Sequence, residues 1–264
     1  MKSKKQHLFI ILASIFLTNA ILAEMIGVKI FSAEGTFGLP PASIPLFGGS
    51  VLDFNLTAGV IIWPIVFITT DVVNEYFGKK GVKKLSYIAA GCIAYAFLVI
   101  YIITLLPPAA FWQEINSTDA EGNYFNINYA FKTIFTQGLG IIAGSLVAFL
   151  IGQLLDVYIF QKLRKYTGSK MIWLRATGST LISQFIDSFV VLGIAFYVLA
   201  PENGRWSIPQ LLSVGTINYI YKFVVAVALT PLIYAAHHFI DRYLGKELSE
   251  EMQAEAAAGS KGFF

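Results

Sequence analysis

The sequence has little of what soluble domains and common enzymes contain. Only 13% of its 264 residues are charged, whereas ordinary soluble domains have about 25%. Its single cysteine, Cys92, excludes an intramolecular disulfide bond. The three histidines, His7, His237 and His238, lie at the ends of apolar segments. A zinc cluster or a Ser-His catalytic pair deep within those segments is therefore excluded.

Two further motifs are missing. The chain has no Gly-x-x-x-x-Gly-Lys-[Ser/Thr] phosphate-binding loop, so it does not itself hydrolyse ATP by that route. No Gly-x-Gly-Asp pattern, which intramembrane aspartyl proteases would need, surrounds Asp71 or Asp187. We therefore expect a protein that is not an enzyme, with no catalytic residues, no cofactor and no metal site. An intramembrane enzyme is the remote alternative.

What the sequence does contain is long apolar runs. Hydrophobic residues make up 56% of the chain and the mean hydropathy is +0.66. The runs are about 20 residues long, the length that a transmembrane helix needs, and not the short alternating segments of a membrane β-barrel. The sequence therefore predicts an all-α integral membrane bundle of six transmembrane helices, at residues 8–31, 56–78, 85–106, 130–160, 176–200 and 208–237.

Basic residues indicate how these helices are oriented. They gather near the N-terminus and in three further segments, 79–84, 162–175 and 242–246, whereas the alternate connections 32–55 and 107–128 contain no Lys or Arg. Because cytoplasmic loops of membrane proteins carry the excess of Lys and Arg, both termini are predicted to be cytoplasmic. The same grouping explains the net charge of +3 without a nucleic-acid partner.

The domain organisation that follows is simple. We expect one six-helix transmembrane domain over residues 1–240 and a solvated cytoplasmic tail over residues 241–264. The first apolar run continues to about Phe31, which is longer than the apolar region of a signal peptide, so we expect a retained helix.

The second predicted helix carries polar residues that are costly in lipid. Asp71 and Glu75 are four residues apart and share a helix face, with Asn74 beside them. Acids inside an apolar segment indicate a binding cavity. The alternative is that both acids lie near the headgroups at a helix end, with Glu75 pairing with the basic segment 79–84.

Other predicted helices add polar side chains near the middle of the membrane. Gln184 and Asp187 share one face, Lys222 lies on the sixth helix, and Asn19 on the first. Asp187 and Lys222 would also satisfy each other as a structural ion pair, and Asn19 could serve helix packing alone. The wider set of buried polar residues adds Glu24, Gln153, Asp156 and Asn218.

Such a cavity is rich in acceptors and amides, so it suits a small molecule with several N–H donors. A carboxylate can accept two parallel hydrogen bonds from the N1–H and 2-amino edge of a guanine-like base. The candidate substrate-binding residues are Asn19, Asp71, Asn74, Glu75, Gln184, Asp187 and Lys222.

Several motifs resemble a known family over residues 8–240. They are Asn19, the run Pro64-x-x-Phe67-x-x-Thr70-Asp71-Val72-Val73-Asn74-Glu75-x-Phe77-Gly78 with its basic loop, Arg175 with Ser179, Ser183-Gln184-x-x-Asp187-Ser188, Lys222 and Thr230-Pro231. Together they resemble the queuosine precursor transporter family, also called the vitamin uptake transporter family. The connections 32–55 and 107–128 are longer than the commonest family pattern, which leaves the substrate range open.

The resemblance implies an inner-membrane protein similar in architecture to the substrate-binding subunits of energy-coupling-factor importers. It further implies uptake of 7-cyano-7-deazaguanine, 7-aminomethyl-7-deazaguanine or both, for queuosine salvage in tRNA. The implied partners are a small planar deazapurine and the lipid bilayer. The alternative is a binding subunit of a vitamin or nucleobase importer that needs a separate ATPase. An energising partner and a homo-oligomer both stay open.

Overall fold

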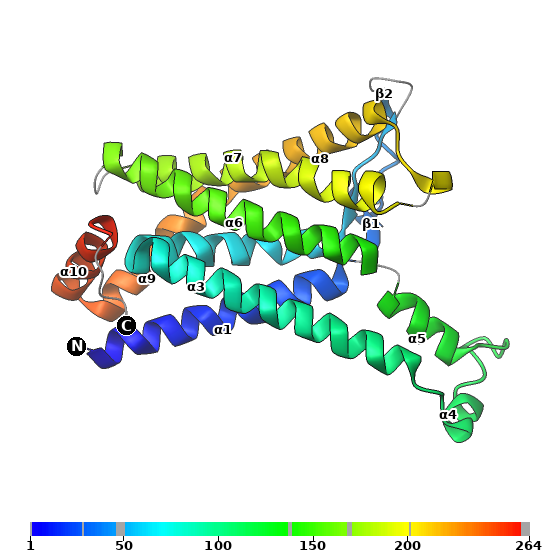
Figure 1. Cartoon of the computed structure of the whole chain (residues 1–264). Helices are drawn as coiled ribbons and strands as arrows, with labels where there is room; N and C mark the ends of the chain where they lie inside the picture. The colour runs from blue at the N-terminus through cyan, green and yellow to red at the C-terminus, as the bar shows by residue number, and fades with distance from the viewer. Residues whose placement is uncertain are drawn as a thin grey trace.

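The computed structural model describes residues 2–27, 29–45, 51–136, 139–167, 171–200 and 202–259. Its long helices run side by side in an elongated bundle (Figure 1). The start of α1 (Lys2–Ile26) and helix α10 (Lys246–Ala257) lie at one end, which we call the terminal end. Strands β1 (Ile30–Ser32) and β4 (Asn55–Thr57) lie at the opposite end, which we call the strand end.

The remaining elements include short helices and strands as well as the long helices of the bundle. In chain order they are α2 (Ala33–Thr36), β2 (Ile44–Pro45), β3 (Val51–Leu52), η2 (Ala58–Ile61), α3 (Trp63–Leu105), α4 (Ala110–Ile115), α5 (Ile127–Thr136), α6 (Leu139–Thr167), α7 (Ile172–Gly193), η3 (Ile194–Val198), η4 (Glu202–Gly204), α8 (Ile208–Ala228) and α9 (Thr230–Leu244).

The prediction of an all-α membrane bundle is confirmed. In the described ranges, five helices are long and apolar enough to cross a membrane: Lys4–Ile26, Trp63–Leu105, Gly144–Thr167, Ile172–Val198 and Ile208–Ala228. The second of these contains both the second and the third predicted helix. A straight helix of 43 residues would be about 65 Å long, roughly twice the hydrocarbon thickness of a bilayer.

Helix α3 is not straight, because it is broken at Gly78. The Gly78 backbone has φ 64° and ψ −170°, a conformation that glycine adopts readily and other residues do not. Figure 1 shows the chain reversing direction there, so that both ends of α3 lie toward the strand end. A Cβ atom at Gly78 would lie 3.0 Å from the Ala256 carbonyl oxygen of α10.

Two other predicted helices each correspond to two elements of the structure. The predicted helix 130–160 is found as α5 and α6; residues 137 and 138 between them lie outside the described ranges. The predicted helix 208–237 is found as α8 and α9, with Pro231 in the first turn of α9. Proline fits the first turn of a helix but cannot supply the N–H that a continuous helix needs.

The predicted outer connection 32–55 contains small antiparallel pairings, β1 with β4 and β2 with β3. Glu34 organises it: one carboxylate oxygen accepts the Phe54 N–H at 2.7 Å and the Ala42 N–H at 3.3 Å, and the other accepts the Ser32 hydroxyl at 3.1 Å. These donors stabilise the charged form of Glu34 and therefore lower its pKa, and the Phe54 N–H has the largest effect.

The predicted tail, residues 241–264, contains helix α10 within its described part, 241–259. Helix α10 packs against α3 at the terminal end and buries Leu248, Ser249, Met252 and Ala256. Burying an apolar side chain such as Met252 from water contributes about 1.5–3 kcal/mol. The charged residues of α10 lie on its other side, where Glu251 and Glu255 pair with Lys5 of α1. A run that reads as charged is therefore an amphipathic helix.

Candidate functional site

A cavity of about 460 Å³ lies between α1, α3, α6, α7 and α8. At the strand end it is lined by Asn55 and Thr57, which are exposed, so the cavity reaches the surface there. Deeper in the bundle it carries polar side chains from all five helices: Glu24, Thr70, Ser145, Gln153, Asp156, Thr180, Ser183, Gln184, Asp187, Ser188, Asn218 and Lys222.

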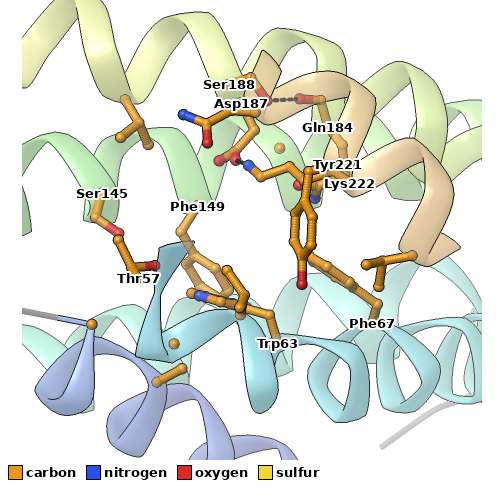
Figure 2. Close-up of a pocket in the computed structure, with 18 of the residues that line it drawn as sticks. Thr57, Trp63, Phe67, Ser145, Phe149, Gln184, Asp187, Ser188, Tyr221 and Lys222 are labelled. Carbon is orange, nitrogen blue, oxygen red and sulfur yellow. Dashed lines mark hydrogen bonds and ion pairs between the residues drawn. The ribbon is translucent and has the colours of Figure 1, made fainter. Parts of the chain in front are cut away.

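Aromatic side chains form much of the remaining wall. Trp63 stacks on Phe67 with ring centroids 5.8 Å apart, and Phe196 stacks on Trp206 at 4.0 Å. Tyr221 and Phe149 also line the cavity. Figure 2 shows Trp63 and Phe67 on α3 across the cavity from Asp187 and Lys222. Flat rings opposite polar groups form a slot suited to a planar, polar ligand.

Three of the predicted site residues meet in this cavity. Lys222 on α8 donates to an Asp187 carboxylate oxygen on α7, and Gln184 lies one turn from Asp187 (Figure 2). The ion pair satisfies both charges without a ligand, as the structural alternative predicts. Gln184 differs, because its buried side-chain oxygen Oε1 has no hydrogen-bond partner within the described chain. An unpaired buried acceptor is costly, so this atom needs a donor from outside the described chain, which a ligand or a water molecule in the cavity could supply.

Glu75 and Asn74 do not line the cavity. Glu75 is fully buried and accepts Arg175 Nη2 at 2.7 Å and Nε at 3.0 Å, and Arg164 Nη2 at 3.3 Å. Asn74 Oδ1 accepts Gln161 Nε2 at 2.7 Å. Arg164 also donates to the Gln253 carbonyl of α10 at 2.7 Å. We call these residues the terminal-end network.

The alternative partner for Glu75, the basic segment 79–84, is wrong, because α6 and α7 supply arginines from far along the chain. The terminal-end network joins α3, α6, α7 and α10. The buried carboxylate of Glu75 is held by both Arg164 and Arg175, so it is not available to a ligand. Glu75 and Asn74 hold helices together at the closed side of the bundle.

Asn19 and Asp71 also lie outside the cavity lining. The Asn19 amide donates to the Ile15 carbonyl of its own helix at 2.7 Å. Asp71 is 2% exposed and faces a separate void of about 10 Å³ bounded by Thr177, Thr180 and Ile233, among others. The void and the cavity have Thr180 in common.

The cavity contains residues that were not among the candidates. Glu24, Gln153, Asp156 and Asn218 belonged to the wider buried polar set, and Glu24 accepts the Ser145 hydroxyl at 2.7 Å. The spacing of Gln153 and Asp156 on one helix face was the signal available for α6. Trp63 and Tyr221 gave no such signal, because aromatic residues make up 15% of the chain and most serve ordinary packing.

The cavity and the fold define the class of this protein. Its polar cavity lies among helices of membrane-crossing length, and no group of three or more His, Cys, Asp and Glu side chains in the described ranges could hold a metal ion. This is the architecture of a multi-pass membrane transporter for a small molecule, in which ionisable residues inside the membrane mark the substrate path.

Comparison with known proteins identifies the family. Residues 57–236 match the family described as "Putative vitamin uptake transporter", and the chain belongs to this family. It is a transporter and not an enzyme.

Three relatives have curated names. The chain is 30% identical over 190 residues to the "Probable queuosine precursor transporter" of Bacillus subtilis (strain 168). The matched region covers 71% of this chain and 75% of that protein. A protein of the same name from Haemophilus influenzae is 28% identical over 67% of this chain and 66% of that protein. The "Queuosine precursor transporter" of Escherichia coli (strain K12) is 25% identical over 80% and 84%.

No solved structure matches the chain. The predicted similarity to the substrate-binding subunits of energy-coupling-factor importers stays a prediction.

Proposed function

We propose that this protein imports queuosine precursors, 7-cyano-7-deazaguanine and/or 7-aminomethyl-7-deazaguanine, across the inner (cytoplasmic) membrane. The names of the three relatives support this substrate class. The observation that carries the proposal is the unpartnered Gln184 Oε1 beside the Asp187–Lys222 pair, in a cavity with aromatic walls.

The chemistry of a 7-deazaguanine fits this arrangement. Its N1–H and 2-amino group offer two parallel donors to the Asp187 carboxylate, and Lys222 can donate to the adjacent carbonyl oxygen. A further ring N–H satisfies Gln184 Oε1. The ring stacks on Trp63 or Tyr221, and the volume of about 460 Å³ lies within the usual range for small-molecule sites.

The proposed topology has six crossings, with both termini in the cytoplasm. Helix α3 crosses twice, on either side of the Gly78 break. In support, the basic segments 79–84, 162–175 and 242–246 all belong to elements that meet at the terminal end (Figure 1). The cavity then opens at the strand end, away from the cytoplasm.

A binding and uptake assay tests this function. The purified chain alone is placed in lipid vesicles, and uptake of labelled 7-cyano-7-deazaguanine is measured beside its affinity in detergent. Gln184→Leu is expected to raise Kd roughly 5- to 30-fold, because the ligand N–H loses its acceptor at a cost of about 1–2 kcal/mol. The matched control is Gln210→Leu, an exposed glutamine in the first turn of α8, which should leave Kd unchanged.

Two outcomes would count against the proposal. Equal affinities of the Gln184 and Gln210 variants for 7-cyano-7-deazaguanine would show that Gln184 does not bind this substrate. If the chain binds the substrate but takes it up only when a separate ATPase complex is added, the alternative of a substrate-binding subunit would be established instead.

A further inference from the structure

Two buried aspartates, one in the cavity wall and one beside it, form no ion pair with any residue that the structure describes. Asp71 on α3 is 2% exposed, and its Oδ1 atom has no hydrogen-bond partner in the part of the chain that the structure describes. It faces the small void between α3, α7 and α9. This atom is the kind of buried acceptor that a ligand must satisfy.

Asp156 on α6 is the neighbour of Asp71. It is 6% exposed and lines the main cavity. Helices α3 and α6 are in contact on both sides of the two aspartates: Thr70 donates to Gln153 Oε1 at 3.3 Å, and Gln161 donates to Asn74 Oδ1 at 2.7 Å. The hydroxyls of Ser183 and Thr180 donate to Asp156 Oδ1 at 3.4 and 3.5 Å. Phe67, Thr180 and Ala226 line both the cavity and the void, and Thr180 is the only one of these three with a hydroxyl group.

The other intramembrane acids next to these two have cations. Glu75 pairs with Arg164 and Arg175, and Asp187 pairs with Lys222. Within the described ranges Asp71 and Asp156 form no ion pair.

The described residues that line the void around Asp71 include no basic side chain. Its own helix brings Glu75, whose charge the two arginines neutralise, and α6 brings Asp156. Helices α7, α8 and α9 bring Thr177, Thr180, Ala226 and Ile233, which do not titrate. His237, one turn beyond Ile233, is engaged by the Tyr76 hydroxyl at 3.1 Å.

Two carboxylates this close, buried and without a cation, cannot both be ionised. A proton shared between them removes the repulsion, as in other buried carboxyl pairs. A metal cation would need several oxygen ligands, whereas a void of about 10 Å³ has room for about one water molecule at most.

We propose that Asp71 and Asp156 form a proton-binding site that couples proton entry to substrate entry. The inference rests on the proposed function and deepens it by naming the energy source. A proton reaches Asp156 from the open cavity and passes to Asp71 by way of the Thr180 hydroxyl. It leaves toward the cytoplasm when the contacts beneath Asp71 open. Between cycles the pair holds one shared proton and carries a charge of −1; the entering proton makes the pair neutral, and its release to the cytoplasm returns the pair to −1.

The test uses the full chain in vesicles that contain a pH-sensitive dye, with 7-cyano-7-deazaguanine as the substrate because this molecule is neutral. For the unmodified protein, substrate entry should acidify the vesicle interior, and an imposed inward proton gradient should drive accumulation above equilibrium. Asp71→Asn should abolish both effects. With the proton gradient imposed, its ratio of substrate accumulation to substrate exchange should equal the ratio measured without a gradient. Asp71→Glu, which keeps the carboxyl group, should retain part of the coupling.

The matched control is Glu121→Gln, which makes the same carboxyl-to-amide change at an exposed position between α4 and α5. It should couple like the unmodified protein. If Asp71→Asn does not fold, the double variant Asp156→Asn, Asp71→Glu takes its place, and this variant too should lose both effects.

Four results would overturn the inference. Gradient-driven accumulation by Asp71→Asn equal to that of Glu121→Gln would remove the site. Accumulation driven by a sodium gradient and insensitive to pH would replace the proton by another ion. Exchange by the unmodified protein without any response to a proton gradient would overturn coupling while the proposed function stands, whereas no exchange at all would overturn both.

Discussion

At the scale of single residues, the environment of a polar side chain decides its role. Glu75 and Asp187 are both intramembrane acids with a basic partner, yet Glu75 is fully buried and held by two arginines. Asp187 instead faces the cavity with a side chain that is 17% exposed. The first is a group that holds helices together, and the second is the group that we propose exchanges its partner for a ligand.

Replacing Glu75 tests this difference. Glu75→Gln leaves Arg164 and Arg175 buried without a counter-charge, so it should lower the free energy of unfolding by about 3–5 kcal/mol. Thermal unfolding of the purified protein in detergent measures the effect. Glu251→Gln is the matched control: it breaks an ion pair with Lys5 at the surface, where such pairs contribute about 0–1 kcal/mol. Equal melting temperatures for the two variants would contradict the role given to Glu75.

At the scale of elements, the break in α3 determines where its polar residues lie. The first half of α3 brings Trp63 and Phe67 to the cavity, and the reversal at Gly78 sends residues 79–105 back along the bundle (Figure 1). Helix α10 closes over this reversal, with Ala256 against Gly78. The positive φ at Gly78 and the close approach of α10 both require the absence of a side chain.

A methyl group at this position should therefore be costly. Gly78→Ala is expected to destabilise the protein by about 1–3 kcal/mol, because alanine is strained at positive φ and its Cβ would press on the α10 backbone. Gly91→Ala is the matched control within the same element: a Cβ there meets no atom within 4 Å, and alanine favours a helix by roughly 0.5–1 kcal/mol. Thermal unfolding and limited proteolysis of α10 should separate the two variants. Equal stability would show that α10 does not depend on the Gly78 turn.

At the scale of the whole molecule, the cavity is accessible from one end only in the described structure. It reaches exposed residues at the strand end, while the terminal-end network and α10 close the other side. A transporter must expose its site to each side in turn. This structure has the arrangement of an outward-open state if the termini are cytoplasmic, as proposed above.

Labelling of single cysteines tests this arrangement. In a Cys92→Ser background, Asn55→Cys in intact cells should react with a thiol reagent that cannot cross membranes, and substrate should slow that reaction because Asn55 lines the cavity. Glu250→Cys, on an exposed position of α10, should react only after the cells are permeabilised. The reverse pattern would invert the proposed topology.

The sequence by itself determined the class of this protein. The apolar runs fixed an all-α membrane bundle, because their length matches the bilayer, and the motifs around Asp71 and Gln184 indicated the family. Gln184, Asp187 and Lys222 were predictable as residues that line a cavity, because polar groups at mid-membrane depth rarely face lipid.

Only the tertiary structure decided which polar residues meet. Helix periodicity gives the face on which Asp71, Asn74 and Glu75 lie, but it does not give the neighbour of that face. Arg164 and Arg175, about 90 and 100 residues away in sequence, turned Glu75 into a packing group, and Asp156 gave Asp71 its neighbour. Gln184 lines the cavity, and its buried Oε1 atom has no partner among the described residues. Long-range packing is the physical reason, since the energy of a buried polar group depends on the partner that the fold brings to it.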